Sequence, residues 1–228
     1  MMSEVKSQAP RRTYKGMNLS ERASARKQQF LDAGKEVFGH VGFQAAGVKD
    51  VCTAAGLTER YYYEAFGNLS KLFEAVYLEA LDHLQQVLDE AASHSLQEPQ
   101  AQLRSMVSSY FKLLKGDRRL ARILIIEVYG AAPAITNLYD RGVRQFAARI
   151  ERHLAPSEAI DNNLDRNLIA TALVGATSSL AMHWYFGGYR EPVSVMTDNC
   201  FAIFCNLAVR SRPKSIRQLP KKDHQPRH

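Results

Sequence analysis

Residues 47–66 read GVKDVCTAAGLTERYYYEAF and hold the most informative pattern of the chain. Two short helical patterns flank Gly56, and glycine is the residue best able to adopt a positive φ in a tight turn. A longer helical pattern precedes them and ends at Gly42, with one apolar stripe formed by Phe30, Ala33, Val37, Phe38 and Val41. Three helices in this order predict a helix-turn-helix, whose second short helix can lie in the major groove of DNA.

The second short helix, residues 58–66, carries side chains that suit DNA. On a helical wheel, Tyr62 and Phe66 share the face directed to the core, whereas Arg60 and Tyr61 lie roughly opposite. Three consecutive tyrosines span about 200° of a helix, so at least one must face outward. An exposed arginine can bind guanine through two hydrogen bonds, and a tyrosine hydroxyl can reach a phosphate or a base edge. Packing against neighbouring helices is the alternative for these rings, and we expect it for Tyr62.

The rest of the chain continues as helical patterns. Asn68 is placed to cap a long helix that runs to about residue 93. Later helical patterns cover residues 103–114, 120–129, 164–186 and 192–209, and another begins at Pro133. The sequence contains no hairpin dipeptide between β-branched runs and no internal repeat. We therefore predict an all-α protein.

The spacing within residues 26–76 resembles the N-terminal domain of the tetracycline-repressor (TetR) family of bacterial transcriptional regulators. Several motifs of that family fall in order and without a gap, namely F-x-x-x-G-[FY] at 38–43, A-G-[LV]-[ST] at 55–58, Y-x-x-F at 63–66 and an apolar pair at 72–73. A weaker similarity is the family's W-[FLY]-x-G-G stretch, which matches residues 184–188.

This resemblance implies an architecture of about nine helices, in which a three-helix DNA-binding domain precedes a helical ligand-binding and dimerisation domain. We expect a disordered basic arm at 1–19, the DNA-binding domain at 20–68, the larger domain at 69–210 and a disordered basic tail at 211–228. It also implies a cytoplasmic, ligand-responsive regulator. The expected form is a repressor that binds a palindromic operator as a homodimer and is released by a small molecule of unknown identity.

The DNA contacts expected from the motif and the resemblance come from Lys49, Thr58, Arg60, Tyr61, Tyr63 and Lys71. The family usually has smaller residues at the positions of Arg60 and Tyr61, so its base preference cannot be carried over. Lys49 and Lys71 stand in for polar groups that the family places nearby. Glu64 faces the DNA with the wrong sign, and it could accept from a cytosine amine or lie beyond the groove.

The segment 164–186 is apolar or small nearly all round, with Ala172, Gly175, Ala176 and Ser179 forming a stripe that permits close helix approach. Such a helix must be covered on both sides. We expect a partner subunit to supply the second cover, through helices near 164–186 and 192–209. Burial in the core of a monomer is the alternative.

Polar groups among apolar ones in the larger domain are the candidates for an effector pocket. They are Met106, Tyr110, Leu114, Glu127, Tyr139, Phe146, Thr177, His183 and Trp184, with the Met, Leu and Phe side chains as walls. Glu127 interrupts the run Ile123–Ile126 and would need a partner if buried. Each of these residues could instead be an ordinary core or solvated group.

Composition and charge narrow the remaining functions. The 228 residues carry a net charge of +7, and the basic groups gather in residues 1–27 and 210–228, as solubilising arms or as contacts to an anionic partner. No apolar run suits a membrane span or a secretory signal. Cys52, Cys200 and Cys205 are expected to be reduced thiols. No catalytic motif, metal site or cofactor site emerges, so we do not expect an enzyme.

Two alternatives remain open at this point. The first is an architectural protein that binds DNA through its basic tails without regard to sequence. The second is a helical protein that binds or converts a small molecule and has no DNA function. Sequence-selective DNA binding would exclude both.

Overall fold

A computed structural model describes residues 19–93, 98–130, 133–153 and 165–209. The predicted basic arm 1–19, apart from Leu19, and the predicted basic tail 211–228 lie outside these residues. Within the described part every element is a helix and none is a strand, which confirms the all-α fold class.

The helices follow one another as α1 (Leu19–His40), α2 (Val48–Ala55), α3 (Glu59–Ala65), α4 (Leu69–Ser93), α5 (Pro99–Gly116), α6 (Arg118–Arg122), the π-helix η1 (Ile123–Glu127), α7 (Val128–Gly130), α8 (Pro133–His153), α9 (Arg166–Phe186) and α10 (Val193–Val209). Because α6, η1 and α7 run on without a break, the described residues form nine helices when these three count as one. No described helix is long and apolar enough to cross a bilayer.

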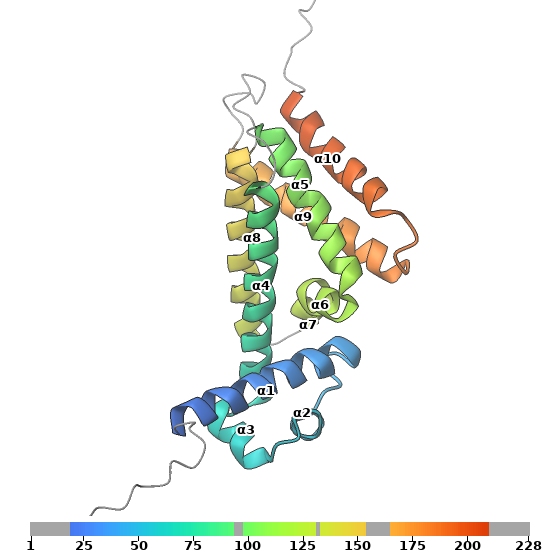
Figure 1. Cartoon of the computed structure of the whole chain (residues 1–228). Coiled ribbons are helices and arrows are strands. Elements are labelled where there is room, and N and C mark those ends of the chain that lie inside the picture. Colours follow the sequence, from blue (N-terminus) through green and yellow to red (C-terminus); the bar gives the residue numbers. More distant parts are fainter. Residues whose placement is uncertain (1–18, 94–97, 131–132, 154–164, 210–228) are drawn as a thin grey trace, which may run out of the picture.

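Helices α1, α2 and α3 form one end of the molecule, with α2 and α3 beneath α1 (Figure 1). Gly56 ends α2 in the left-handed conformation, at φ +64°, and its N–H bonds back to the carbonyls of Cys52 and Thr53. This turn lets α3 place Tyr62 and Phe66 against Phe30 of α1, with ring centroids 5.4 and 6.3 Å away. The predicted inward face of α3 is therefore confirmed.

One member of the predicted apolar stripe of α1 is wrong. Val41 is 51% exposed, whereas Phe30 and Phe38 are fully buried. The reason is that α1 ends at His40, so that the chain leaves the helical register before Val41.

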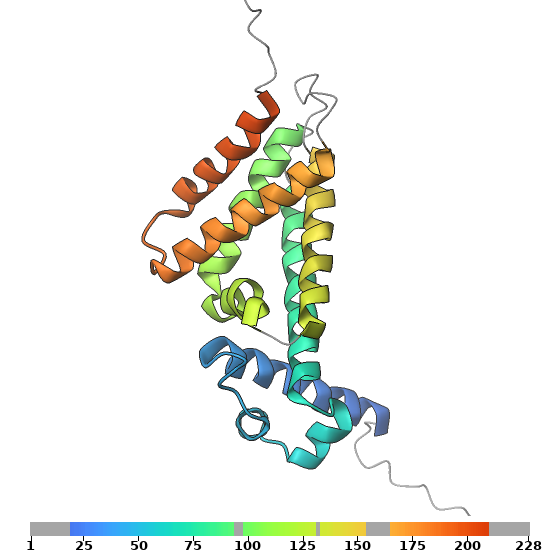
Figure 2. The same cartoon turned by 180° about the vertical axis from the view of Figure 1, so that it is seen from behind.

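The long helix α4 connects this end to the larger bundle (Figures 1 and 2). Asn68 precedes α4, and its side chain accepts the N–H of Lys71 at 2.9 Å, as the predicted N-cap requires. The buried side chains of α4 run its whole length, from Leu72 to Ala91. Beyond it, α5 and α8 flank α4, α9 packs on α8, and α10 packs on α5. The second and larger half is thus a bundle built around α4.

The segment 120–129 was predicted as one regular helix, but it contains a π-helical turn. Residues 123–127 form η1, where hydrogen bonds join residues five apart, between short α-helical turns. Its side chains Ile123, Leu124, Ile125 and Glu127 are buried. A π turn rotates the residues that follow it relative to a regular α-helix. A regular helical wheel therefore gives the wrong side-chain directions across residues 120–129.

Candidate functional site

Helix α3 lies at the end of the molecule remote from α10 (Figure 1), and polar and aromatic side chains are exposed on its outer face. Arg60 is the most open of them, with 84% of its side chain exposed, and Tyr61 and Tyr63 are exposed by 38 and 53%. Thr58 is the N-cap residue of α3, but its side chain makes no capping hydrogen bond. The Thr58 hydroxyl and the Arg60 guanidinium are therefore both exposed to solvent on one short helix.

Two contacts hold this face in place before any partner arrives. The Arg60 Nε donates to Glu64 Oε1 at 3.0 Å, one turn further along α3. The guanidinium of Arg26 on α1 lies over the Tyr61 ring, 4.4 Å from its centroid, which is a cation–π contact. In the free protein, Arg60 is thus paired with Glu64 of the same helix, and Tyr61 is held by Arg26 of α1.

Lys49 and Lys71 lie near the N-terminal ends of α2 and α4, and both are exposed. The N-terminus of a helix attracts anions because its first N–H groups point outward and its dipole is positive there. With Thr58 at the N-terminus of α3, each of α2, α3 and α4 begins with an exposed polar group. This arrangement suits contacts to successive phosphates.

Tyr62 is the buried counterpart of these side chains. It is fully buried, and no described residue offers its hydroxyl a hydrogen bond. Burial raises the pKa of Tyr62 to about 12, so the phenol stays neutral at any physiological pH.

Replacing Tyr62 with phenylalanine is expected to leave the free energy of unfolding unchanged or to raise it by about 1 kcal/mol, because a buried hydroxyl without a partner is a desolvation penalty. DNA affinity should not change, since the ring is hidden. Urea unfolding of the variant and of Tyr63→Phe, where the hydroxyl is exposed, provides the measurement. A loss above about 1 kcal/mol would reveal a partner for this hydroxyl.

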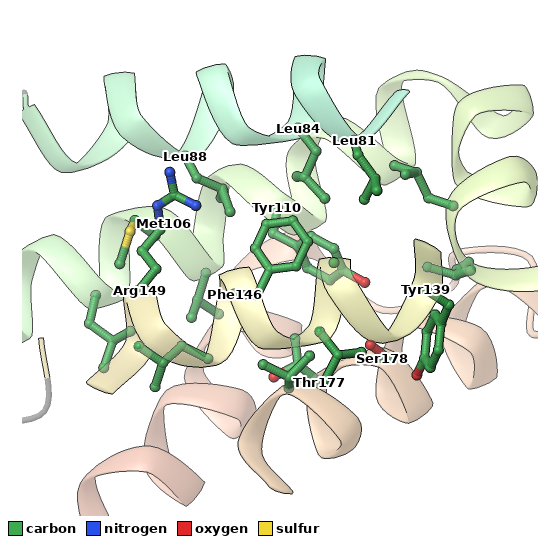
Figure 3. A pocket seen from close by; sticks show the side chains of 18 of the residues that line it. Leu81, Leu84, Leu88, Met106, Tyr110, Tyr139, Phe146, Arg149, Thr177 and Ser178 are labelled. Atoms are coloured by element: carbon green, nitrogen blue, oxygen red, sulfur yellow. The ribbon is translucent and has the colours of Figure 1, made fainter. Parts of the chain in front are cut away.

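A cavity lies inside the larger bundle, where α4, α5, η1, α8, α9 and α10 meet (Figure 3). It holds about 110 Å³ of free space. Nearly all of its lining is aliphatic or aromatic, including Leu81, Leu84 and Leu88 of α4 and Phe146 of α8. An apolar space of this kind accepts a hydrocarbon group rather than a strongly hydrated one.

Hydroxyl groups and one guanidinium interrupt this apolar lining. Tyr139 pairs with Tyr129 through their hydroxyls at 2.9 Å, and burial raises the pKa of Tyr110. The Thr177 hydroxyl donates to the carbonyl of Leu173 at 2.7 Å. The lining groups Tyr110, Tyr139 and Thr177 all carry hydroxyls, so they can orient a ligand through hydrogen bonds.

Arg149 of α8 is the charged residue of the cavity wall, and the sequence analysis missed it. Its side chain is only 12% exposed, and its Nη2 donates to Asp89 of α4 at 2.6 Å. The carboxylate of Asp89 is 64% exposed, so this pair lies where the cavity meets the surface. A usable signal existed, because Arg149 follows Gly142 and Phe146 at helical spacing and therefore shares their apolar face.

The predicted pocket residues divide into two groups. Met106, Tyr110, Tyr139, Phe146 and Thr177 line the cavity. The structure places Leu114, Glu127, His183 and Trp184 elsewhere.

These four residues have other roles for physical reasons. His183 is exposed on α9. Trp184 is fully buried against Phe111, and its Nε1 donates to the carbonyl of Glu191 at 3.1 Å. Leu114 is core, and its carbonyl accepts the hydroxyl of Tyr189 at 2.9 Å. Trp184 and Leu114 are thus held in the contacts between α5 and the end of α9, and His183 faces solvent.

Glu127 lies between the two halves of the molecule, and it has the partners that its burial demands. Its Oε1 accepts from Arg122 Nε and its Oε2 from the N–H of Phe43, each at 2.7 Å. Arg122 also donates to the carbonyls of His40 at 2.5 Å and Val41 at 3.2 Å. This group of contacts, Arg122 and Glu127 with the chain at 40–43, is called the joint below.

Comparison with known proteins finds a family with the same helix-turn-helix. Residues 30–76 match the family model of bacterial regulatory proteins, tetR family. Residues 30–76 therefore carry the DNA-binding domain of this family. The matched TetR segment runs from the middle of α1 into α4, and so contains the whole helix-turn-helix with its exposed Arg60 and Tyr61.

Comparisons over longer stretches of the chain extend the similarity to the larger bundle. The HTH-type transcriptional activator FasR of Mycolicibacterium smegmatis is 24% identical over 159 residues, which cover 70% of this chain and 72% of FasR. The fatty acid degradation regulator FadR of Bacillus halodurans superposes with a TM-score of 0.68 at 16% identity, covering 78% of this chain and 94% of FadR. FadR of Bacillus subtilis in complex with stearoyl-CoA gives 0.67 at 17% identity, covering 78 and 96%. The chain therefore carries the DNA-binding domain of a transcriptional regulator, and the similarity of fold extends to about 78% of its length.

Proposed function

We propose that the protein is a dimeric repressor in the cytoplasm, that it binds a palindromic operator through α3, and that a ligand in the cavity releases it. We assign DNA binding to residues 20–68 and ligand binding with dimerisation to residues 69–210, and we propose no catalytic activity. The observation that carries the proposal is an α3 whose exposed arginine and tyrosines sit on a family helix-turn-helix.

The DNA face supports sequence reading by Arg60, Tyr61 and Tyr63, and phosphate contact by Lys49, Thr58 and Lys71. Arg60 must exchange Glu64 for a base edge when it binds, because the two are paired in the free protein. This exchange favours sites that offer a good acceptor, such as the O6 and N7 of guanine. The Arg60–Glu64 pair therefore favours selectivity between DNA sequences at the expense of overall DNA affinity.

The bare face of α9 and α10 supports the dimer. Ala172, Gly175, Ala176 and Ser179 of α9 are all exposed in the single chain, as is Leu168 at 66%. A stripe of small residues lets two helices approach closely, and the neighbouring exposed apolar groups favour burial. A second copy of this face would provide the cover and would set two α3 helices one DNA turn apart, about 34 Å.

The cavity supports a ligand with a long acyl chain and an anionic head. Its lining is apolar, and the Arg149 guanidinium lies where it opens. FadR of B. subtilis is recorded with stearoyl-CoA, and the relative from B. halodurans is a fatty acid degradation regulator. The free space of about 110 Å³ is less than the 150 Å³ of an engineered cavity that takes benzene, so a long chain must part the walls.

The testing experiment selects operators from genomic fragments with the purified protein at about 150 mM salt, where non-specific binding is weakened. We expect a short palindrome to be enriched and to be released by stearoyl-CoA. Broad retention without a shared sequence would overturn operator reading, and an enriched palindrome that stearoyl-CoA does not release would overturn the acyl ligand alone.

Replacing Arg149 with methionine is expected to weaken stearoyl-CoA binding about 10- to 100-fold, because a hydrogen bond to a charged group contributes about 1.5–3 kcal/mol. Methionine keeps the apolar stem but removes the charge. Gln145→Met is the matched control, since Gln145 bridges α8 to α4 nearby through Gln85 at 2.6 Å but is not part of the cavity wall. Titration calorimetry measures both, and equal affinities would remove Arg149 from the site.

A further inference from the structure

The π-helical turn η1 takes part in both functional regions of the molecule. Leu124 and Ile125 form part of the cavity wall. Glu127, on the same turn, belongs to the joint and is 8% exposed. One turn of helix therefore meets the ligand space with two side chains and the DNA-binding end with a third.

The carboxylate of Glu127 is suited to its place because it faces two donors. The N–H of Phe43 and the Nε of Arg122 approach different oxygens, each at 2.7 Å. A carboxylate accepts at both oxygens, whereas an amide accepts at one and donates at the other. Glutamine in this position would satisfy only one of the two partners.

The joint also caps the C-terminal end of α1. The last carbonyls of a helix lack partners within it and carry negative partial charge. Arg122 supplies two N–H groups to the carbonyls of His40 and Val41 at that point. Gly42 follows with φ +88°, and a Cβ there would lie 2.6 Å from Arg122 Nη2 and 2.8 Å from Glu127 Oε1. Glycine is needed for this backbone conformation, and a side chain here would displace the end groups of Arg122 and Glu127.

A second path joins the cavity to the same point along α4. Tyr77 lines the cavity and stacks on Phe73, with centroids 6.4 Å apart. Phe73 in turn packs on Phe43 at 4.9 Å, and Phe43 is the residue whose N–H Glu127 holds. Movement of either cavity wall, α4 or η1, therefore reaches Phe43.

We propose that Glu127 is the coupling residue through which occupation of the cavity lowers DNA affinity. The inference rests on the proposed function and adds its internal route. A chain that enters the cavity displaces Leu124 and Ile125, the π turn rewinds toward α-helical hydrogen bonding, and Glu127 rotates away from Phe43. Release of the joint frees the end of α1, and with it the orientation of α2 and α3.

The experiment compares the parent with Glu127→Gln for binding to the selected operator, with and without saturating stearoyl-CoA. In the parent the ligand is expected to lower operator affinity on the order of tenfold, within the usual range of allosteric coupling. In Glu127→Gln operator affinity without ligand is expected to be lowered by a similar factor, and the further effect of stearoyl-CoA to fall close to none. Affinity for stearoyl-CoA itself should stay within about threefold of the parent or rise.

Lys35→Gln is the matched control, because Lys35 pairs α1 with Asp117, the residue before α6, on the same interface but outside the joint. It should keep the parent's operator affinity and response. Arg122→Lys keeps the charge but cannot reach Glu127 and both carbonyls together, so it should lose part of the coupling; it tests the proposal if Glu127→Gln does not fold. Amide exchange at Phe43 reports this contact directly, and stearoyl-CoA should speed it about tenfold in the parent and in the control but not in Glu127→Gln.

The outcomes separate this inference from the proposed function. If Glu127→Gln keeps both the parent's operator affinity and its response, the coupling role of Glu127 is overturned while the acyl ligand stands. If the parent itself does not respond to stearoyl-CoA, the acyl ligand falls. The operator affinity of Glu127→Gln without ligand then tests whether the joint controls DNA binding. Affinity equal to that of the parent overturns this role of Glu127, and about tenfold weaker binding supports it.

Discussion

Glutamate in place of Gly175 is expected to give a folded monomer that has lost operator binding. A Cβ at Gly175 would meet no described atom within 4 Å, so the single chain has room for the new side chain. Glutamate in a helix interior is also better than glycine by about 0.5–1 kcal/mol. In the dimer, however, two carboxylates would face one another in a buried contact, at a cost of several kcal/mol.

The expected loss of operator affinity is at least about 100-fold, because a monomer reads one half-site and gives up the second. Light scattering after size-exclusion chromatography gives the mass, and fluorescence anisotropy gives the affinity. Gly116→Glu is the matched control, since Gly116 of α5 also has no described neighbour within 4 Å of its Cβ position. A Gly175→Glu protein that stays dimeric would show that α9 does not form the interface.

Truncating Arg60 and Tyr61 together to alanine is expected to bring operator binding down about 100- to 1000-fold, close to non-specific affinity. Each base contact contributes about 1–3 kcal/mol of discrimination, and both side chains are exposed on the same face of α3. Stability should be nearly unchanged, because neither residue belongs to the core. Anisotropy with operator and scrambled duplexes measures the difference.

Two further substitutions separate reading from attraction. Glu64→Gln should raise affinity a few-fold for operator and scrambled DNA alike, since it frees Arg60 and removes a negative charge near the phosphates. Lys71→Ala should weaken binding about equally for both duplexes and reduce the salt slope by about one. If the Arg60 and Tyr61 double variant behaved like Lys71→Ala, α3 would contact phosphates and not bases.

The helix-turn-helix could be predicted from sequence because its determinants are local. Gly56 imposes the turn, the Asn68 cap starts α4, and the spacing of Tyr62 and Phe66 turns one face of α3 inward. None of these depends on residues far away in the chain. The error at Val41 marks the limit of this reasoning, since a helix that stops one residue early redirects the next side chain.

The cavity could be predicted only in part. Phe146 and Tyr139 lie on an apolar face of α8 that periodicity reveals, but Leu114 and Trp184 look equally suitable in sequence and lie outside the cavity. Which apolar residues border free space depends on how six separate elements meet. The π turn of η1 adds a rotation that a regular helical wheel does not include. This rotation directs the Glu127 carboxylate to the N–H of Phe43.

The uncovered stripe of α9 has a consequence for cells that hold two versions of the gene. A chain damaged only in α3 keeps Ala172, Gly175, Ala176 and Ser179 intact, so it would still pair with an undamaged chain. In the proposed dimer, such a mixed pair would have one intact α3 and would contact only half of the palindrome. A defective allele would thus be dominant-negative. The loss of operator binding would grow with the fraction of intact chains that pair with damaged ones.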